Sequence, residues 1–115
     1  MPRAPDLALT ATLALGAAMA VATLLPLPPG PGIPGSDKMH HLLGFAVLTL
    51  PLATTRPRAL FWLVPVLAGY GALIELVQPL VGRGRELADW LADLAGIGLG
   101  ALVGVMLRRV WRRAG

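Results

Sequence analysis

Residues 87–107 read LADWLADLAGIGLGALVGVML, an apolar stretch with only two charged residues, Asp89 and Asp93. A helix needs about 20 mostly apolar residues to cross the hydrocarbon of a bilayer, so this stretch predicts a membrane-spanning helix. Positions four apart on a helix share one face. That face carries both aspartates and continues into Gly96, Gly100 and Gly104. Small residues at this spacing let helices approach closely in lipid, so we expect the glycines and both aspartates to point into a helical bundle.

Three further apolar stretches come earlier in the chain, at residues 7–25, 39–54 and 60–81. None of them alternates over segments of roughly 10 residues, as a transmembrane β-strand would. The sequence therefore predicts an all-α fold in which residues 1–115 form a single domain, a bundle of four transmembrane helices with short loops. Pro51 is expected to kink or end the second helix.

The first stretch carries two features that bear on its role. Arg3 and the run Ala18-Met19-Ala20 resemble the basic region and cleavage site of a signal peptide. The apolar run nevertheless continues through Leu25, which is longer than a typical signal-peptide core, so we retain it as a span. A stripe of small residues, Ala14, Ala18 and Ala22, could meet the glycine face of residues 87–107.

The composition argues against a soluble protein. Of the 115 residues 56% are hydrophobic and 14% charged, whereas a soluble domain carries about 25% charged residues. The mean hydropathy is +0.70. The cations lie in loops and at the C-terminus, as in membrane proteins, which argues against a nucleic-acid partner. With Cys 0, the chain has no disulfide, thiolate metal site or cysteine nucleophile.

The distribution of Lys and Arg predicts the orientation of the bundle. An even number of spans places both termini on one side of the membrane, and cytoplasmic loops carry the excess of cations. The side of the termini holds Arg3, Arg56, Arg58, Arg108, Arg109, Arg112 and Arg113, and the other side holds Lys38, Arg83 and Arg85. We therefore expect cytoplasmic termini, with the loops 26–38 and 82–86 facing outward.

Polar side chains gather near the outer end of the predicted bundle. An ionisable group at bilayer depth costs about 3 kcal/mol and usually has a partner or a function. The candidates for acid–base catalysis are Glu75, Asp93 and His41, and the candidates for ligand binding are Asp37, Lys38, Gln78, Arg83 and Asp89. The alternative is that these groups only pair with one another, for example Asp93 with His41, and hold the helices in register.

The same residues include types that bind metal ions. Imidazole and carboxylate groups suit zinc or manganese, and His41, Glu75, Asp89 and Asp93 supply them. No closely spaced ligand pair such as His-x-x-x-His is present. The sequence alone therefore predicts no metal site and no cofactor.

These motifs resemble the VanZ-like family of small bacterial membrane proteins. The matching residues are Asp37-Lys38-x-x-His41, Glu75-x-x-Gln78, Gly82-Arg83, Asp89, Asp93 and Gly96. The chain departs from the family pattern at Phe45, where a Tyr is expected, and at Asp93, where Asn is frequent. The resemblance implies a multi-pass protein of the bacterial inner membrane and a link to low-level resistance to teicoplanin. It implies no established reaction.

Three functions follow from these expectations. The first is an envelope protein whose outward-facing polar residues bind a lipid-linked or anionic headgroup ligand, with Lys38, Arg83 and Arg85 holding phosphate; whether it catalyses a reaction stays open. The second is a non-enzymatic scaffold that packs as a homo-oligomer or against another envelope protein. The third is a proton or ion path, which an apolar inner half of the bundle disfavours.

Overall fold

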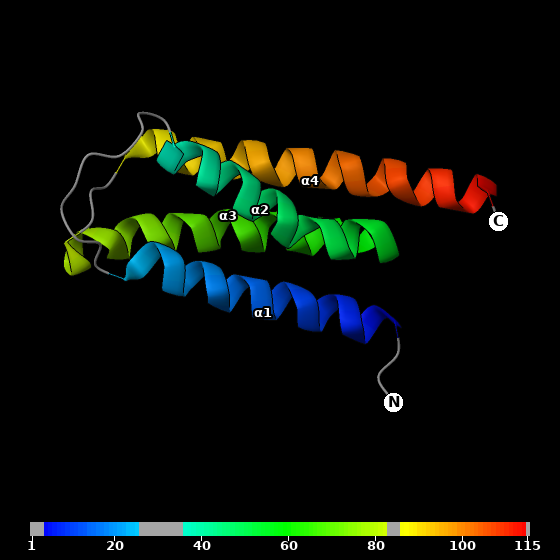
Figure 1. The fold of residues 1–115 in the computed structure, drawn as a ribbon, viewed down its shortest axis with the longest axis horizontal. Coiled ribbons are helices and arrows are strands. Elements are labelled where there is room, and N and C mark those ends of the chain that lie inside the picture. The colour runs from blue at the N-terminus through cyan, green and yellow to red at the C-terminus, as the bar shows by residue number, and fades with distance from the viewer. Residues whose placement is uncertain (1–3, 26–35, 83–85, 115) are drawn as a thin grey trace.

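The computed structural model describes residues 4–25, 36–82 and 86–114, and this part of the chain is helical. The main helices are α1 (Ala4–Leu24), α2 (Ser36–Thr55), α3 (Leu60–Val77) and α4 (Leu87–Ala114). Two short 3-10 helices, η1 (Pro57–Ala59) and η2 (Gln78–Val81), precede and follow α3. Successive main helices run in opposite directions, so α1 begins at the end of the molecule where α4 ends (Figure 1). The predicted all-α fold is confirmed.

The helix boundaries differ from the predicted spans mainly at α2 and α4. Pro51 does not end α2, which continues to Thr55. The hydroxyls of Thr54 and Thr55 donate to the carbonyls of Leu50 and Pro51, one turn earlier in the helix, at 2.8 Å each. α4 extends beyond residue 107 to Ala114, because arginine favours helix.

Within the described residues, three helical segments are long and apolar enough to cross a membrane: Leu7–Leu24, Pro57–Val81 and Leu87–Ala114. Large apolar side chains on them are exposed, for example Phe61 at 91% and Leu80 at 83%. Apolar surface of this extent requires an apolar environment such as lipid. α2 does not reach the same hydropathy, because its first two turns contain Asp37, Lys38 and two histidines.

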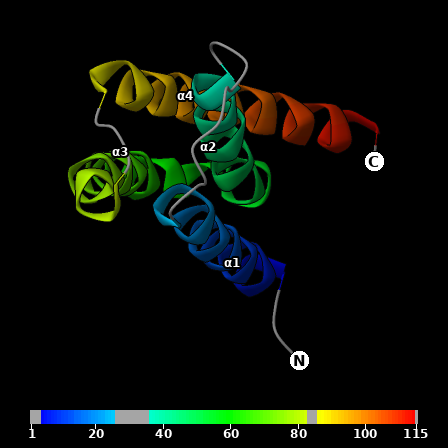
Figure 2. The same cartoon turned by 60° about the vertical axis from the view of Figure 1, so that its left-hand side comes forward.

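α2 lies at the centre of the bundle and packs most closely against α4 (Figure 2). A Cβ atom added at Gly96 would lie 2.1 Å from the Leu42 carbonyl oxygen, and one at Gly100 would lie 2.4 Å from that of Ala46. Only glycine at these positions permits this approach of the two backbones. The expectation that the glycine face points into the bundle is therefore confirmed.

The alanine stripe of α1 is not the partner of that glycine face. Within the described residues, α1 contacts α2, α3 and η2 but not α4, and the stripe Ala14, Ala18 and Ala22 is exposed. The backbone of α2 occupies the space instead. α1 is attached through hydrogen bonds: Thr12 Oγ1 donates to the Leu48 carbonyl at 3.2 Å, and the Tyr70 hydroxyl donates to the Gly16 carbonyl.

At the opposite end of the bundle from the starts of α2 and α4, Arg108 caps the end of α2. Its guanidinium donates to the carbonyls of Thr54 at 3.1 Å and Thr55 at 2.8 Å. The last carbonyls of a helix have no partner within the helix, and basic side chains commonly satisfy them. Arg108, expected only as part of a basic orientation signal, therefore also ties α4 to α2.

Candidate functional site

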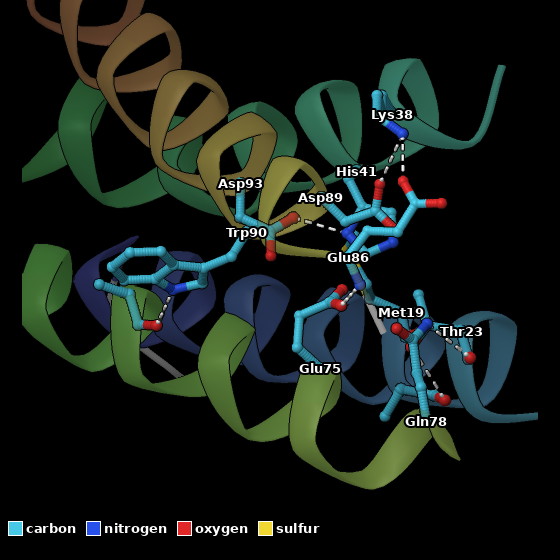
Figure 3. Close-up of polar contacts among 12 residues, drawn as sticks. Met19, Thr23, Lys38, His41, Glu75, Gln78, Glu86, Asp89, Trp90 and Asp93 are labelled. Atoms are coloured by element: carbon cyan, nitrogen blue, oxygen red, sulfur yellow. Dashed lines mark hydrogen bonds and ion pairs between the residues drawn. The ribbon is translucent and has the colours of Figure 1, made fainter. Parts of the chain in front are cut away.

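Most of the predicted site residues converge where α2 and α4 begin and α3 ends (Figure 3). His41 comes from α2, Glu75 from α3, and Asp89 and Asp93 from α4. All four side chains are buried. Together with Lys38 and Glu86 they form what we call the polar cluster: Lys38, His41, Glu75, Glu86, Asp89 and Asp93.

The deepest contact in the polar cluster joins His41 to Asp93. Nδ1 of His41 lies 2.7 Å from Oδ1 of Asp93, and because a carboxylate accepts, this ring nitrogen carries the proton. Gly71 of α3 makes room for the pair, since a Cβ there would lie 2.6 Å from Oδ2 of Asp93. The contact fixes the orientation of the imidazole, and Nε2, the other ring nitrogen, takes no part in it.

Glu75 joins α3 to the beginning of α4. Its Oε2 accepts a hydrogen bond from the backbone N–H of Glu86 at 3.2 Å. The first N–H groups of a helix lack partners within it and favour a nearby negative charge. The Glu75 carboxylate is therefore positioned by the start of α4, although the two residues belong to different helices.

Lys38 lies at the exposed edge of the polar cluster. Its Nζ lies 2.5 Å from Oε2 of Glu86 and 3.4 Å from Oδ1 of Asp89. The hydrogen bond with Lys38 lowers the pKa of the Glu86 carboxyl, and the same bond raises the pKa of Lys38. Glu86 was missed among the predicted site residues because it lies just before the predicted span 87–107. The signal for it is its spacing, three residues before Asp89 and seven before Asp93, which continues the face of α4 that carries both aspartates.

Not every predicted residue joins the polar cluster. Gln78 is buried, but its amide donates to the Thr23 carbonyl at 3.2 Å and so connects η2 to the end of α1. Arg83 lies outside the described residues, and so does the side chain of Asp37. Within the described part, the polar cluster contains four carboxylates beside Lys38 and His41.

An apolar groove of about 600 Å³ lies between α1 and α2 and reaches the polar cluster at His41. We call it the α1–α2 groove. Its lining is Leu15, Ala18, Met19, Ala22, Thr23, His40, His41, Leu43, Gly44 and Val47. It therefore combines an apolar wall with a polar end, the arrangement typical of a small-molecule site.

The carboxylates of the polar cluster can bind a cation or accept hydrogen bonds from hydroxyl groups, and His41 can bind a further polar group through Nε2. Nε2 of His41 and Oδ2 of Asp93 are buried without a hydrogen-bond partner among the described residues. Buried polar atoms of this kind are usually satisfied by another group. The chain matches no protein-family model, and comparisons with curated proteins and with solved structures also find no match.

Proposed function

We propose that this chain is a multi-pass protein of the bacterial inner membrane that binds a lipid-linked envelope ligand. The apolar part of the ligand occupies the α1–α2 groove, and its headgroup meets the polar cluster. The observation that carries this proposal is that one groove joins apolar side chains to the buried imidazole of His41.

A four-span topology is part of this proposal and is supported by the direction of the helices. α2 starts beside the start of α4 and ends beside the start of α3 at the opposite end of the molecule (Figure 1). It has 20 residues, which corresponds to about 30 Å of helix. If the three apolar segments cross the membrane, α2 connects the two sides and crosses it as well.

The distribution of cations supports an outward-facing polar cluster. The four arginines Arg108, Arg109, Arg112 and Arg113 lie at the end of α4, far from the polar cluster at its start. Cytoplasmic ends carry such excess positive charge. The headgroup site therefore faces the outer leaflet, where lipid-linked envelope precursors are used.

The chemistry of the polar cluster favours a headgroup rich in hydroxyl groups. Carboxylates accept hydrogen bonds from hydroxyls, and Glu75, Asp89 and Asp93 provide three buried carboxylates. A phosphate in the same ligand requires a cation, and Lys38 of the polar cluster is one; the two arginines of the loop 82–86, which are expected from the sequence to hold phosphate, lie outside the described residues. A sugar attached to a lipid through phosphate combines both requirements.

We also propose that the chain is VanZ-like. The supporting observation is that Lys38, His41, Glu75, Asp89 and Asp93, which carry the resemblance in sequence, lie together in three dimensions. A link to teicoplanin resistance follows as an expectation. Expression of the protein in a susceptible host should then raise the inhibitory concentration of teicoplanin.

The direct test is native mass spectrometry of the protein extracted with its surrounding lipids. The wild type should retain one lipid-linked molecule per chain, and its mass identifies the headgroup. Ala22→Phe fills the α1–α2 groove from an exposed position and should remove the ligand. Neither residue of the His41–Asp93 pair is changed in this variant.

A matched control uses the same helix face. Ala14 is exposed about two turns earlier on α1 and does not line the α1–α2 groove, so Ala14→Phe should retain the ligand. The proposal fails if the wild type carries no lipid beyond its annular shell, or if Ala22→Phe carries as much as Ala14→Phe.

A further inference from the structure

Three buried side chains from three helices bring metal-ligating atoms together in the polar cluster. A ring nitrogen of His41, a carboxylate oxygen of Glu75 and one of Asp89 all lie within 4.8 Å of one another. Ligand atoms around a tetrahedral zinc ion, each about 2.1 Å from it, are roughly 3.4 Å apart. A side-chain movement on the order of 1 Å would therefore complete the geometry.

The histidine is held as metal-binding histidines usually are. Such a histidine donates its other ring N–H to a carboxylate, which fixes the ring and directs the free nitrogen at the ion. Asp93 accepts from Nδ1 of His41 at 2.7 Å. Nε2 is thus the nitrogen available, and it is buried with no hydrogen-bond partner among the described residues. The unpartnered Nε2 is a separate observation from the grouping of the carboxylates, and it too indicates that a ligand binds here.

Charge gives a further reason for a cation at this position. Glu75 and Asp89 are 5% and 2% exposed, and two carboxylates buried near each other repel unless one takes up a proton or a positive charge lies beside them. Among the described residues, Nζ of Lys38 lies 3.4 Å from Oδ1 of Asp89. A divalent ion beside His41 would offset the repulsion from within.

We propose that His41, Glu75 and Asp89 bind one divalent transition-metal ion, with Asp93 as the residue that orients His41. One imidazole with two carboxylates suits zinc or manganese. Three protein ligands leave a further coordination position open. His41 also lines the α1–α2 groove, so a molecule in the groove would lie beside the imidazole that binds the ion. The metal site stands on its own geometry and does not require the lipid-binding proposal.

The test is an isothermal titration calorimetry experiment in which zinc chloride is added to the purified, chelator-treated full chain. The wild type should saturate at one zinc per chain. Asp89→Asn and Glu75→Gln should each weaken binding at least tenfold. Glu86→Gln removes a carboxylate that also contacts Lys38 but is no ligand, and it should change the affinity less than threefold.

X-ray absorption at the zinc edge, measured on the wild type, gives a readout that does not depend on how the variants fold. One imidazole nitrogen with oxygen neighbours supports the site. Asp93→Asn should weaken zinc binding about 10-fold to 100-fold while the spectrum keeps its imidazole. The proposal is overturned if the wild type shows no saturable binding, if the spectrum lacks imidazole, or if Glu86→Gln weakens binding as much as Asp89→Asn.

Discussion

At the scale of single residues, the contact between His41 and Asp93 holds α2 and α4 in register at the polar cluster. Both side chains are almost fully buried, at 1% and 0% exposed. A buried polar pair is strongly destabilised when one partner is removed, whereas replacing both partners with apolar groups is often tolerated. The pair can therefore be tested by comparing single and double substitutions.

Asp93→Leu should lower the free energy of unfolding by about 3 kcal/mol, because His41 is left with a buried, unsatisfied N–H. Adding His41→Phe to that variant should recover most of the loss. Chemical unfolding in detergent, followed by circular dichroism, measures both values. A double variant that is as unstable as the sum of the two single variants would rule out a direct pair.

The contact between Lys38 and Glu86 predicts a pH dependence. Its hydrogen bond lowers the pKa of Glu86 below the usual 4.5. The contact therefore contributes stability above about pH 4.5, and this contribution is lost as pH falls through the lowered pKa. At alkaline pH it is lost as pH rises through the pKa of Lys38, which lies above 10.5.

Carbon-13 NMR of the Glu86 carboxyl measures this effect directly. The midpoint of its titration should lie below 4.5 in the wild type and rise toward that value in Lys38→Met. His40→Ala serves as a control. His40 is exposed near the start of α2, and among the described residues the ion pair of Glu86 is with Lys38 and not with His40. An unchanged midpoint in Lys38→Met would show that the contact does not form in solution.

The sequence identified most residues of the polar cluster, and the pair of Asp93 with His41 was named there as the structural alternative and is present in the structure. Burial of Asp89 and Asp93 could be predicted because they share a helix face with the glycines, and helix periodicity is a local property. The role of Gln78 could not be predicted, because its amide bonds to Thr23 of α1, and contacts between distant segments depend on how whole helices pack.

At the scale of helices, the spacing of glycines on α4 sets the distance to α2. Gly100→Ala would place a Cβ 2.4 Å from the Ala46 carbonyl oxygen, so the helices must separate. We expect a loss of about 1–3 kcal/mol in the free energy of unfolding, the usual cost of overpacking.

Gly98→Ala is the matched control on the same helix. A Cβ at Gly98 meets no atom within 4 Å, so only the gain in helix propensity remains, worth up to about 1 kcal/mol. The two variants should therefore shift the stability in opposite directions. Equal effects would mean that the glycine face of α4 does not contact α2 in the folded protein.

The helices themselves were predictable because each apolar stretch is long and bounded by polar or proline-rich segments. Their pairing was not. The alanine stripe of α1 has the composition of a packing face, yet α2 takes the place next to α4, because its backbone reaches the glycines. Small residues on two helices indicate that close packing can occur but do not select the partner.

At the scale of the whole molecule, the proposed function requires α2 to cross the membrane with the polar cluster at its outer end. The chain has no cysteine, so single-cysteine variants can be labelled without background. Useful positions are the two ends of α2, Ser36 and Thr55, and the end of α4, Ala114.

The most direct measurement is labelling of these three variants in intact cells with a maleimide that does not cross the membrane. We expect Ser36→Cys to be labelled from outside, and Thr55→Cys and Ala114→Cys to be labelled only after the cells are opened. Labelling of Ser36→Cys and Thr55→Cys from the same side would show that α2 does not cross the membrane and would contradict the proposed topology.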